Sequence, residues 1–267
     1  MACHAGTWIS SDSRIAALSG NNGERMPVCA AVQKVHNTLP GGRSDFTETI
    51  PGRTGTMSVS GEGGGKMILQ AEHLTFSYRR RKQECILQDY SLSITSGERV
   101  GLRAPSGRGK TTLCRLLAGY EKPQQGKVLL NGKALSSFRG VCPVQMVWQH
   151  PETVVDPLLQ LGVTLNEAGK PEERLLKELH IEEGWLKRYP SELSGGELQR
   201  FCLARALHPD TRFLLCDEIT AMLDLVTQAQ IWNFLLEEGK QRDLGMLIVS
   251  HDDALLQKVC TRIETLP

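Results

Sequence analysis

Short apolar strands alternate with helices along residues 67–267, and this alternation constrains the fold more than any other feature. Strand patterns occur at 67–71, 74–78, 90–94, 98–102, 127–130, 144–148, 213–216 and 246–250. Helical patterns occur at 111–118, 171–187, 197–207 and 228–238. Apolar strands separated by helices favour a sheet that is mostly parallel and covered on both faces.

Residues 1–66 differ in composition from the remainder of the chain. They hold 11 of the 26 glycines and show no sustained period of 2 or 3.6 residues. Such a segment buries too little apolar surface to offset its ordering entropy, so we expect it to be disordered. The run Glu62-Gly-Gly-Gly-Lys66 is what a translated ribosome-binding site would give, which suggests that Met67 is the true start. The alternative is a genuine flexible N-terminal arm.

Charge and hydropathy exclude several classes of protein. Lysine and arginine number 31 against 30 aspartates and glutamates, so no excess of positive charge indicates nucleic-acid binding. No apolar run approaches the roughly 20 residues that a membrane helix needs, and no secretory signal begins the chain. The 8 cysteines stand singly, which is typical of reduced, buried thiols. We therefore expect a protein of the cytosol.

A glycine-containing loop joins the predicted strand 98–102 to the next helix. Its sequence over 104–111 is Ala-Pro-Ser-Gly-Arg-Gly-Lys-Thr. Glycines let backbone N–H groups approach phosphate oxygens, and the N-terminus of the helix adds partial positive charge. Lys110 would reach the β- and γ-phosphates of ATP, while the Thr111 hydroxyl would bind Mg²⁺. The ATP-binding candidates in this loop are Ser106, Gly107, Arg108, Gly109, Lys110, Thr111 and Thr112. A lone Gly-Lys-Thr arises by chance in roughly one chain in ten, so the loop needs support from other motifs.

The loop departs from the usual phosphate-binding pattern at its first position, where Ala104 replaces glycine. If that position requires a positive φ, alanine costs about 1–2 kcal/mol. Pro105, however, restricts the residue before it to extended conformations with negative φ. We therefore expect Ala104 to be harmless.

A second motif is far more specific. Residues 193–200 read Leu-Ser-Gly-Gly-Glu-Leu-Gln-Arg, in which Ser194 and Glu197 also form a capping box at the start of a helix. This octapeptide has the form of the ABC signature, and on it and the motifs around it the chain resembles the ABC ATPase family over residues 67–267. The resemblance implies a signature of Ser194, Gly195, Gly196 and Glu197 that closes over ATP held by an opposite subunit.

The resemblance also implies a fold. It is an α/β, ABC-type P-loop ATPase with a mostly parallel core sheet, an N-terminal antiparallel β-subdomain and an α-helical subdomain at about 150–200. The segment between Gln149 and Ser194 is short, so the helical subdomain should be small.

The run Phe-Leu-Leu-Cys-Asp-Glu at 213–218 looks like the family's apolar strand that ends in two carboxylates. By this resemblance Asp217 would join the Mg²⁺ shell. Glu218 would polarise the attacking water, because phosphoryl transfer needs a positioned base near the metal.

Several single residues extend the resemblance. Gln149 resembles the glutamine that senses Mg²⁺ and contacts the permease, and His251 resembles the switch histidine that contacts the γ-phosphate. Tyr78 resembles the aromatic residue that stacks on adenine, although a strand aromatic can equally belong to the core. Leu223 and Asp224 resemble the dimer-contact loop, with Ile219 in place of the proline usual there.

The spacing of prolines and aspartate in Gln149-His-Pro-Glu-Thr-Val-Val-Asp-Pro157 is similar to the subgroup that serves peptide, nickel and related metal importers. The resemblance implies an ATP-binding and hydrolysing subunit of an import system, with ATP and Mg²⁺ as cofactors. Expected partners are membrane permease subunits, a second ABC ATPase (identical or different) and a solute-binding protein, with no nucleic acid. The expected location is peripheral, on the cytoplasmic side of the cell membrane.

Two other interpretations of the motifs compete with this one. A soluble ABC protein acting on ribosomes or DNA usually carries two cassettes or a long coiled coil, and neither pattern is present. A binding-only regulator is suggested by Ala104, but Glu218, His251 and the intact signature argue against it. The transported substrate cannot be read from a cassette, which contacts the permease and not the cargo.

Overall fold

The computed structural model describes residues 65–78, 85–167 and 169–267. The expected N-terminal extension therefore lies, apart from its last two residues, outside the described residues. The strands are β1 (Ile68–Phe76), β2 (Leu87–Thr95), β3 (Arg99–Arg103), β4 (Gln125–Leu130), β5 (Lys133–Ala134), β6 (Val144–Val147), β7 (Phe213–Asp217), β8 (Gly245–Val249) and β9 (Arg262–Thr265). The helices are α2 (Lys110–Leu117), α3 (Leu161–Leu165), α4 (Glu173–Glu178), α5 (Gly195–Ala206), α6 (Leu225–Gln241) and α7 (Asp253–Val259), with single 3₁₀ turns at Leu135–Ser137, Pro151–Thr153, Glu183–Lys187 and Pro190–Glu192.

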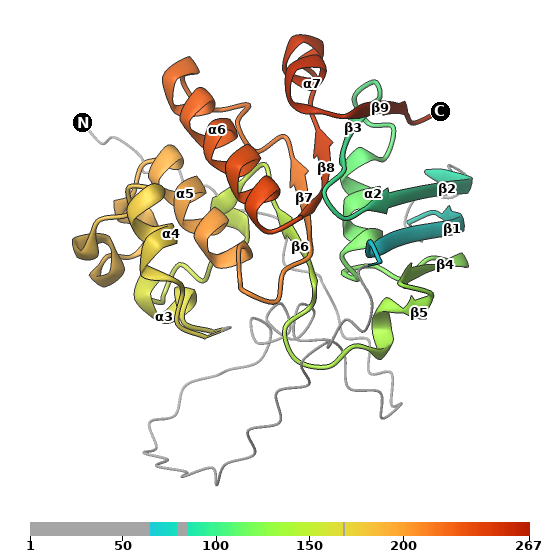
Figure 1. The fold of residues 1–267 in the computed structure, drawn as a ribbon. Coiled ribbons are helices and arrows are strands. Elements are labelled where there is room, and N and C mark those ends of the chain that lie inside the picture. Colours follow the sequence, from blue (N-terminus) through green and yellow to red (C-terminus); the bar gives the residue numbers. More distant parts are fainter. Residues whose placement is uncertain (1–64, 79–84, 168) are drawn as a thin grey trace, which may run out of the picture.

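Two sheets organise these elements. One is entirely parallel, with strand order β6-β7-β8-β3-β9, and the other is antiparallel, with strand order β2-β1-β4-β5. The hairpin between β4 and β5 turns at Asn131 and Gly132, whose φ values of 50° and 73° fit the tight turn that this dipeptide favours. Figure 1 shows the antiparallel strands on one side, the helices α3, α4 and α5 on the other, and the parallel strands between them. The α/β fold expected from the sequence is confirmed.

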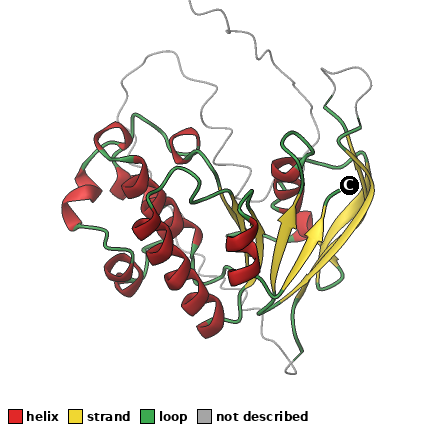
Figure 2. Ribbon diagram, turned by 90° about the horizontal axis from the view of Figure 1, so that it is seen from above, coloured by secondary structure: helices red, strands yellow, loops and turns green. Residues whose placement is uncertain are grey.

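The core forms on both faces of the parallel sheet. All of β7 is buried, and its side chains alternate: Phe213 and Leu215 join the cluster that holds α2 and the antiparallel sheet, while Leu214 and Cys216 join the cluster of α5 and α6. Helix α2 is thus packed between the two sheets, with Leu113 almost entirely removed from solvent. Seen from above in Figure 2, most helices lie to one side of the strands, and a few lie among them.

Two sequence expectations about single elements were wrong. Residues 74–78 and 67–71 do not form separate strands but one irregular strand, β1, with a register shift beside His73, whose φ is +51°. Residues 171–187 do not form one helix, because the backbone turns left-handed at His180 and separates α4 from the 3₁₀ turn at Glu183–Lys187. The turn lets Ile181 pack in the same cluster as Leu175, whereas a continuous helix would point the two side chains in different directions.

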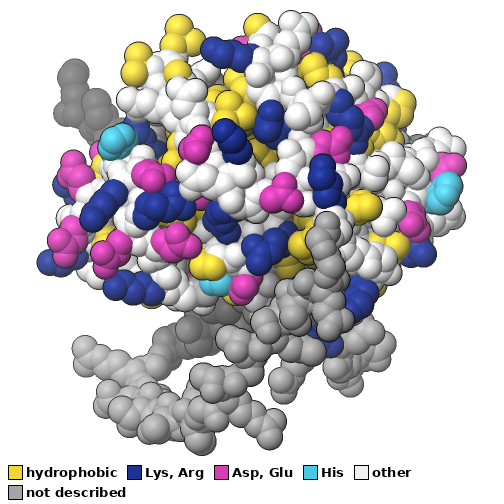
Figure 3. All heavy atoms as spheres, viewed as in Figure 1, with side chains coloured by type: hydrophobic (Ala, Val, Ile, Leu, Met, Phe, Trp, Pro, Cys, Tyr) yellow, Lys and Arg dark blue, Asp and Glu magenta, His cyan; other side chains and the backbone are white. Residues whose placement is uncertain are grey.

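The surface seen in Figure 3 has no marked separation of positive from negative charge, and the described cysteines form no disulfide. On the face seen in Figure 3, basic and acidic side chains are interspersed rather than gathered by sign. Over the part of the chain that the structure describes, no helix has both the length and the apolar character that a membrane span needs. No disulfide joins the cysteines that the structure describes, and burial raises the pKa of Cys202 to about 12, which keeps that thiol protonated at neutral pH.

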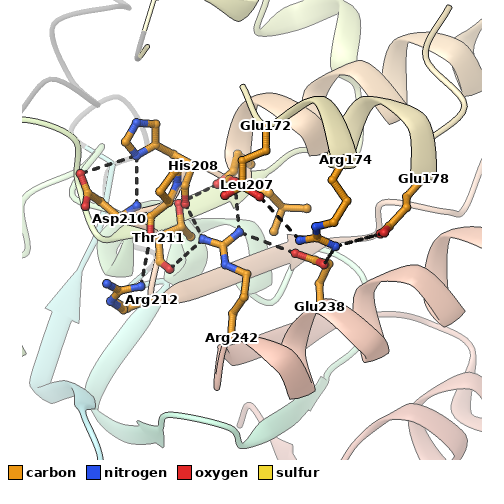
Figure 4. Close-up of polar contacts among 12 residues, drawn as sticks. Glu172, Arg174, Glu178, Leu207, His208, Asp210, Thr211, Arg212, Glu238 and Arg242 are labelled. Atoms are coloured by element: carbon orange, nitrogen blue, oxygen red, sulfur yellow. Dashed lines mark hydrogen bonds and ion pairs between the residues drawn. The ribbon is translucent and has the colours of Figure 1, made fainter. Parts of the chain in front are cut away.

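A buried carboxylate fastens α4 to α6. The Glu238 side chain is 1% exposed, and its Oε1 lies 2.5 Å from Nη1 of Arg174 on α4. Nη1 of Arg242 lies 3.8 Å from the other carboxylate oxygen, and Nη2 donates to the carbonyl of His208 at 2.5 Å. Figure 4 shows the two guanidinium groups on either side of Glu238. The helical segment between β6 and β7 is therefore tied by charge to the helix that comes after β7.

Replacing Arg174 by methionine should lower the free energy of unfolding by about 2 kcal/mol or more, because the dry carboxylate of Glu238 would lose its nearest cation. Urea unfolding followed by circular dichroism would measure it. Lys170 pairs with Glu173 at 3.6 Å where both side chains are more than 70% exposed, so Lys170→Met is the matched control, with an expected effect within about 0.5 kcal/mol. Equal effects of the two substitutions would contradict this prediction.

Candidate functional site

One cavity opens where the parallel strands β3, β6, β7 and β8 end, the edge at which α/β proteins bind ligands. Its volume is about 830 Å³. Its lining comprises Tyr78, Ile86, Ser106, Gly107, Gly109, Lys110, Thr111, Thr112, Gln149, Glu218 and His251. Ten of these residues are predicted ATP-binding or catalytic residues, and the fold brings them together from the ends of five strands, Tyr78 following β1 and the others following β3, β6, β7 and β8.

The loop between β3 and α2 has the backbone that an anion cradle requires. Gly107 and Gly109 adopt φ values of +79° and +90°, which side chains rarely allow. A Cβ on Gly107 would meet open space, whereas a Cβ on Gly109 would lie 2.5 Å from the Ile86 side chain. Ala104 is not among the described residues with positive φ, so the expectation of an ordinary backbone at this position is confirmed.

Lys110 begins α2 and is only 6% exposed. Its Nζ donates to the carbonyl oxygens of Ala104 at 2.8 Å and Pro105 at 3.2 Å, and lies 3.2 Å from Nε2 of His251. Among the described residues no carboxylate lies within ion-pair distance of this ammonium group. A nearly buried cation with neutral partners is suited to an anionic ligand.

Glu218 comes directly after β7 and is contacted by two other predicted site residues. Its Oε2 accepts from Nε2 of Gln149 at 3.2 Å, and its Oε1 lies 2.9 Å from Nε2 of His251. The same Nε2 lies near Lys110, so it can donate a hydrogen bond to this carboxylate when it carries a hydrogen, or accept one from Lys110 when it does not. The Glu218 backbone has a φ of +51°, and its N–H donates to the carbonyl of Val249 at 3.1 Å. A left-handed non-glycine residue at this point is held by its surroundings, as is common at functional sites.

Asp217, the last residue of β7, is 2% exposed. Its Oδ1 is buried and has no hydrogen-bond partner among the described residues. Burial raises the pKa of Asp217, the hydrogen bond with the Thr111 side chain lowers it, and the charge of Glu218 raises it again. An unpartnered buried oxygen next to a hydroxyl is a fitting pair of ligands for a hard divalent cation that keeps several waters.

The predicted aromatic residue lies in the cavity wall. Tyr78 packs edge-on against Phe76, with ring centroids 4.9 Å apart, and its hydroxyl lies 3.5 Å from the Thr112 hydroxyl. It also packs against the core, as the second interpretation of this residue expects, and stacking on adenine stays a prediction. Ile86 lines the cavity but was not predicted from the sequence, because an apolar residue beside the start of a strand carries no local signal of ligand binding. Arg108, although predicted to bind ATP, is exposed and does not line the cavity.

The signature lies at the N-terminus of α5 and outside the cavity lining. The capping box is present: the Ser194 N–H donates to Oε2 of Glu197 at 2.7 Å, and the Glu197 N–H donates to Oγ of Ser194 at 3.4 Å. Hydrogen bonds from the backbone and the side chain of Ser194 to the carboxylate lower the pKa of Glu197. A Cβ on Gly195 would meet no atom within 4 Å, so the start of the helix is open. That it serves nucleotide on an opposite subunit stays a prediction.

Comparison with known proteins assigns the family. The sequence pattern of the family described as ABC transporter matches residues 87–221. The nickel import ATP-binding protein NikE of Rhodospirillum rubrum is 34% identical over 222 residues, which cover 73% of this chain and 79% of that protein. The nickel import system ATP-binding protein NikE of Staphylococcus aureus is 33% identical over 209 residues, which cover 73% and 85%.

Solved structures agree on the fold. An ATP-binding cassette in a dimeric post-hydrolysis state, bound to ADP and phosphate, matches with a TM-score of 0.65 at 23% identity, covering 74% of this chain and 94% of that one. The cassette cbiO1 of Clostridium perfringens matches with a TM-score of 0.62 at 24% identity, covering 76% and 85%. The site geometry and these relatives lead to one conclusion: the chain belongs to the ABC transporter family and is the ATPase subunit of such a transporter.

Proposed function

We propose that this chain binds MgATP between two cassettes and uses its hydrolysis to drive a separate membrane permease that imports nickel, a related metal complex or peptides. The observation that supports the chemistry best is the set of contacts among Lys110, His251, Glu218 and Gln149 in a single cavity. These four side chains come from four different segments, and each has a place in phosphoryl transfer.

The residues divide the work of hydrolysis. Backbone N–H groups of the 104–111 loop and the Lys110 ammonium would bind the phosphates, and Tyr78 would pack on the adenine. Glu218 would accept the proton of the attacking water, because each of its oxygens has a lone pair left beside the contact it already makes. His251 lies between Lys110 and Glu218, where a γ-phosphate would replace the direct contact between lysine and histidine.

Thr111, Gln149 and Asp217 are the residues that would hold Mg²⁺. The ion supplies positive charge that stabilises the phosphate oxygens during transfer. The unpartnered Oδ1 of Asp217 supports this assignment, since a buried anionic oxygen without a donor is costly unless a cation completes it.

The proposal for partners rests on the exposed surface and on the relatives. Met222, Leu225 and Val226 are each at least 67% exposed and lie shortly after Glu218 in the sequence, where the family places its dimer contact. A second cassette, identical or different, would cover them and bring its own Ser194–Glu197 segment to the nucleotide. The remaining proposed partners are permease subunits and a solute-binding protein, which would place this chain on the cytoplasmic face of the membrane.

The choice of cargo rests on relatives whose names state nickel import. Cells of the source organism that lack this gene should take up less radioactive nickel or less labelled dipeptide, and the wild-type gene should restore the loss. A gene carrying Glu218→Gln should fail to restore it, because the permease would have no working motor. If the uptake of both compounds did not depend on the gene, the proposed import function would be contradicted, but the proposed ATPase activity would not.

Glu218→Gln should keep MgATP binding and slow hydrolysis by roughly 10²-fold or more, because the amide cannot accept the proton of the water. Turnover and nucleotide affinity would be measured on the chain with its partner subunits, and the trapped state should be a dimer that forms only with ATP. Glu152→Gln, a change at the exposed carboxylate of the His150–Glu152 pair, is the control. Hydrolysis at a near-normal rate by Glu218→Gln would take this residue out of its proposed role.

Ala104→Gly should change ATP affinity by less than about threefold, since Ala104 already has an ordinary backbone and no strain to relieve. Titration of both chains with a fluorescent ATP analogue would compare them. A gain of about tenfold, equal to roughly 1.4 kcal/mol, would show that alanine strains the loop and weakens the natural site.

A further inference from the structure

Trp148, the residue before Gln149, contacts side chains from two helices, and the first of these helices is α2, which follows the phosphate-binding loop. Trp148 comes directly after β6. The guanidinium carbon of Arg115 lies 4.8 Å from the centroid of the Trp148 ring, which places a cation on an aromatic ring. The Tyr120 ring meets the same indole edge-on, with centroids 5.4 Å apart. Arg115 belongs to α2, the helix that begins at Lys110, so Trp148 is fixed relative to the phosphate loop.

The second of these helices is the signature helix. Nε2 of Gln199 donates to the backbone carbonyl of Trp148 at 3.3 Å. Gln199 lies on α5 and is 2% exposed, so its amide cannot exchange this partner for bulk water. The helix whose N-terminus carries Ser194 and Glu197 is therefore hydrogen-bonded to the backbone immediately before Gln149.

Contacts continue from there into the reaction centre. Nε2 of Gln149 donates to Glu218, the proposed base. A displacement of the Trp148 backbone would move Gln149 with it, because the two residues share a peptide bond. The Nε of Arg115 is buried without a hydrogen-bond partner among the described residues, so this nitrogen does not hold the side chain in place.

We propose that Arg115 and Gln199 are positioning residues of the ATPase site: they fix Trp148 between α2 and α5 and thereby aim Gln149 at Glu218. The inference rests on the proposed function and deepens it. Neither residue lines the cavity, and neither touches a reacting atom. Because Gln199 is on the signature helix, a shift of α5 when a second cassette closes would reach Gln149 through this hydrogen bond.

The first test separates positioning from packing. In the chain assembled with its permease and second cassette, Arg115→Met should lower kcat about tenfold, leave the KM for ATP within about twofold and leave Tm nearly unchanged. Arg115→Lys keeps a cation for the ring and should recover kcat to within about threefold of wild type. If kcat fell equally in both variants, or if KM and Tm changed while kcat did not, Arg115 would have a packing role only.

The second test asks whether the effect passes through Gln149. In a Gln149→Ala background, Arg115→Met should lower kcat by less than about twofold, because the group that it aims is already gone. Gln199→Met, which keeps the volume and removes the donor, should show the same dependence. Full, multiplicative losses in the Gln149→Ala background would overturn the proposal.

A third measurement does not need turnover. The fluorescence emission of Trp148 is obtained by subtracting the emission of the Trp148→Phe variant from that of the wild-type chain. Addition of MgATP should change this difference, because the Trp148 ring adjoins Gln149. An emission that MgATP leaves unchanged would overturn the link between Trp148 and the nucleotide site. If the wild-type assembly hydrolysed no ATP, the proposed function would fail by itself, and the fluorescence would still test the link between Trp148 and the nucleotide site on which this inference depends.

Discussion

The register of three parallel strands is the constraint on which the rest of the site depends. Val249 of β8 pairs with Leu102 of β3 on one side and with Asp217 of β7 on the other. The three strands therefore end at one level of the sheet, and the segments after them emerge side by side. A slip of one residue in β7 would turn Asp217 to the opposite face and bury a different side chain. The alternating, fully buried side chains of β7 prevent that slip, so packing of the core fixes the geometry of the chemistry.

The same packing leaves the charges of the site incompletely satisfied. Lys110 and Asp217 are both nearly buried, yet the first is held by neutral groups and the second has an oxygen without a donor among the described residues. A charge in such surroundings is costly to fold and is stabilised only when its partner arrives. A phosphate would give the Lys110 ammonium an oppositely charged partner, and a divalent cation would do the same for the Asp217 carboxylate. Ligand binding should therefore stabilise the folded state as well as start the reaction.

The sequence predicted those parts of the molecule that local chemistry determines. A glycine-containing loop, a capping box and an apolar strand that ends in two carboxylates all act over a few residues, and the structure has each of them in place. Ile86 and the break at His180 were not predicted, because both depend on distant segments that pack against them. Helix α7 and strand β9 were not predicted either, since both lie beyond the last strand pattern, which ends at residue 250. The left-handed backbone of Glu218 has no local signal: glutamate does not favour it, and only the surrounding contacts impose it.

Two buried polar side chains add to the apolar contacts that hold the helical segment beside the catalytic sheet. Glu238 ties α4 to α6 by charge, whereas Gln199 ties α5 to the backbone beside Gln149 by a single neutral hydrogen bond. The difference matters because a charged pair with one dry partner resists separation more strongly than one amide-to-carbonyl bond. If the helical segment moves against the sheet during a catalytic cycle, the weaker connection is the one that can open and re-form. That connection leads to Gln149 and Glu218, which is where a movement of the signature helix could change the rate of hydrolysis.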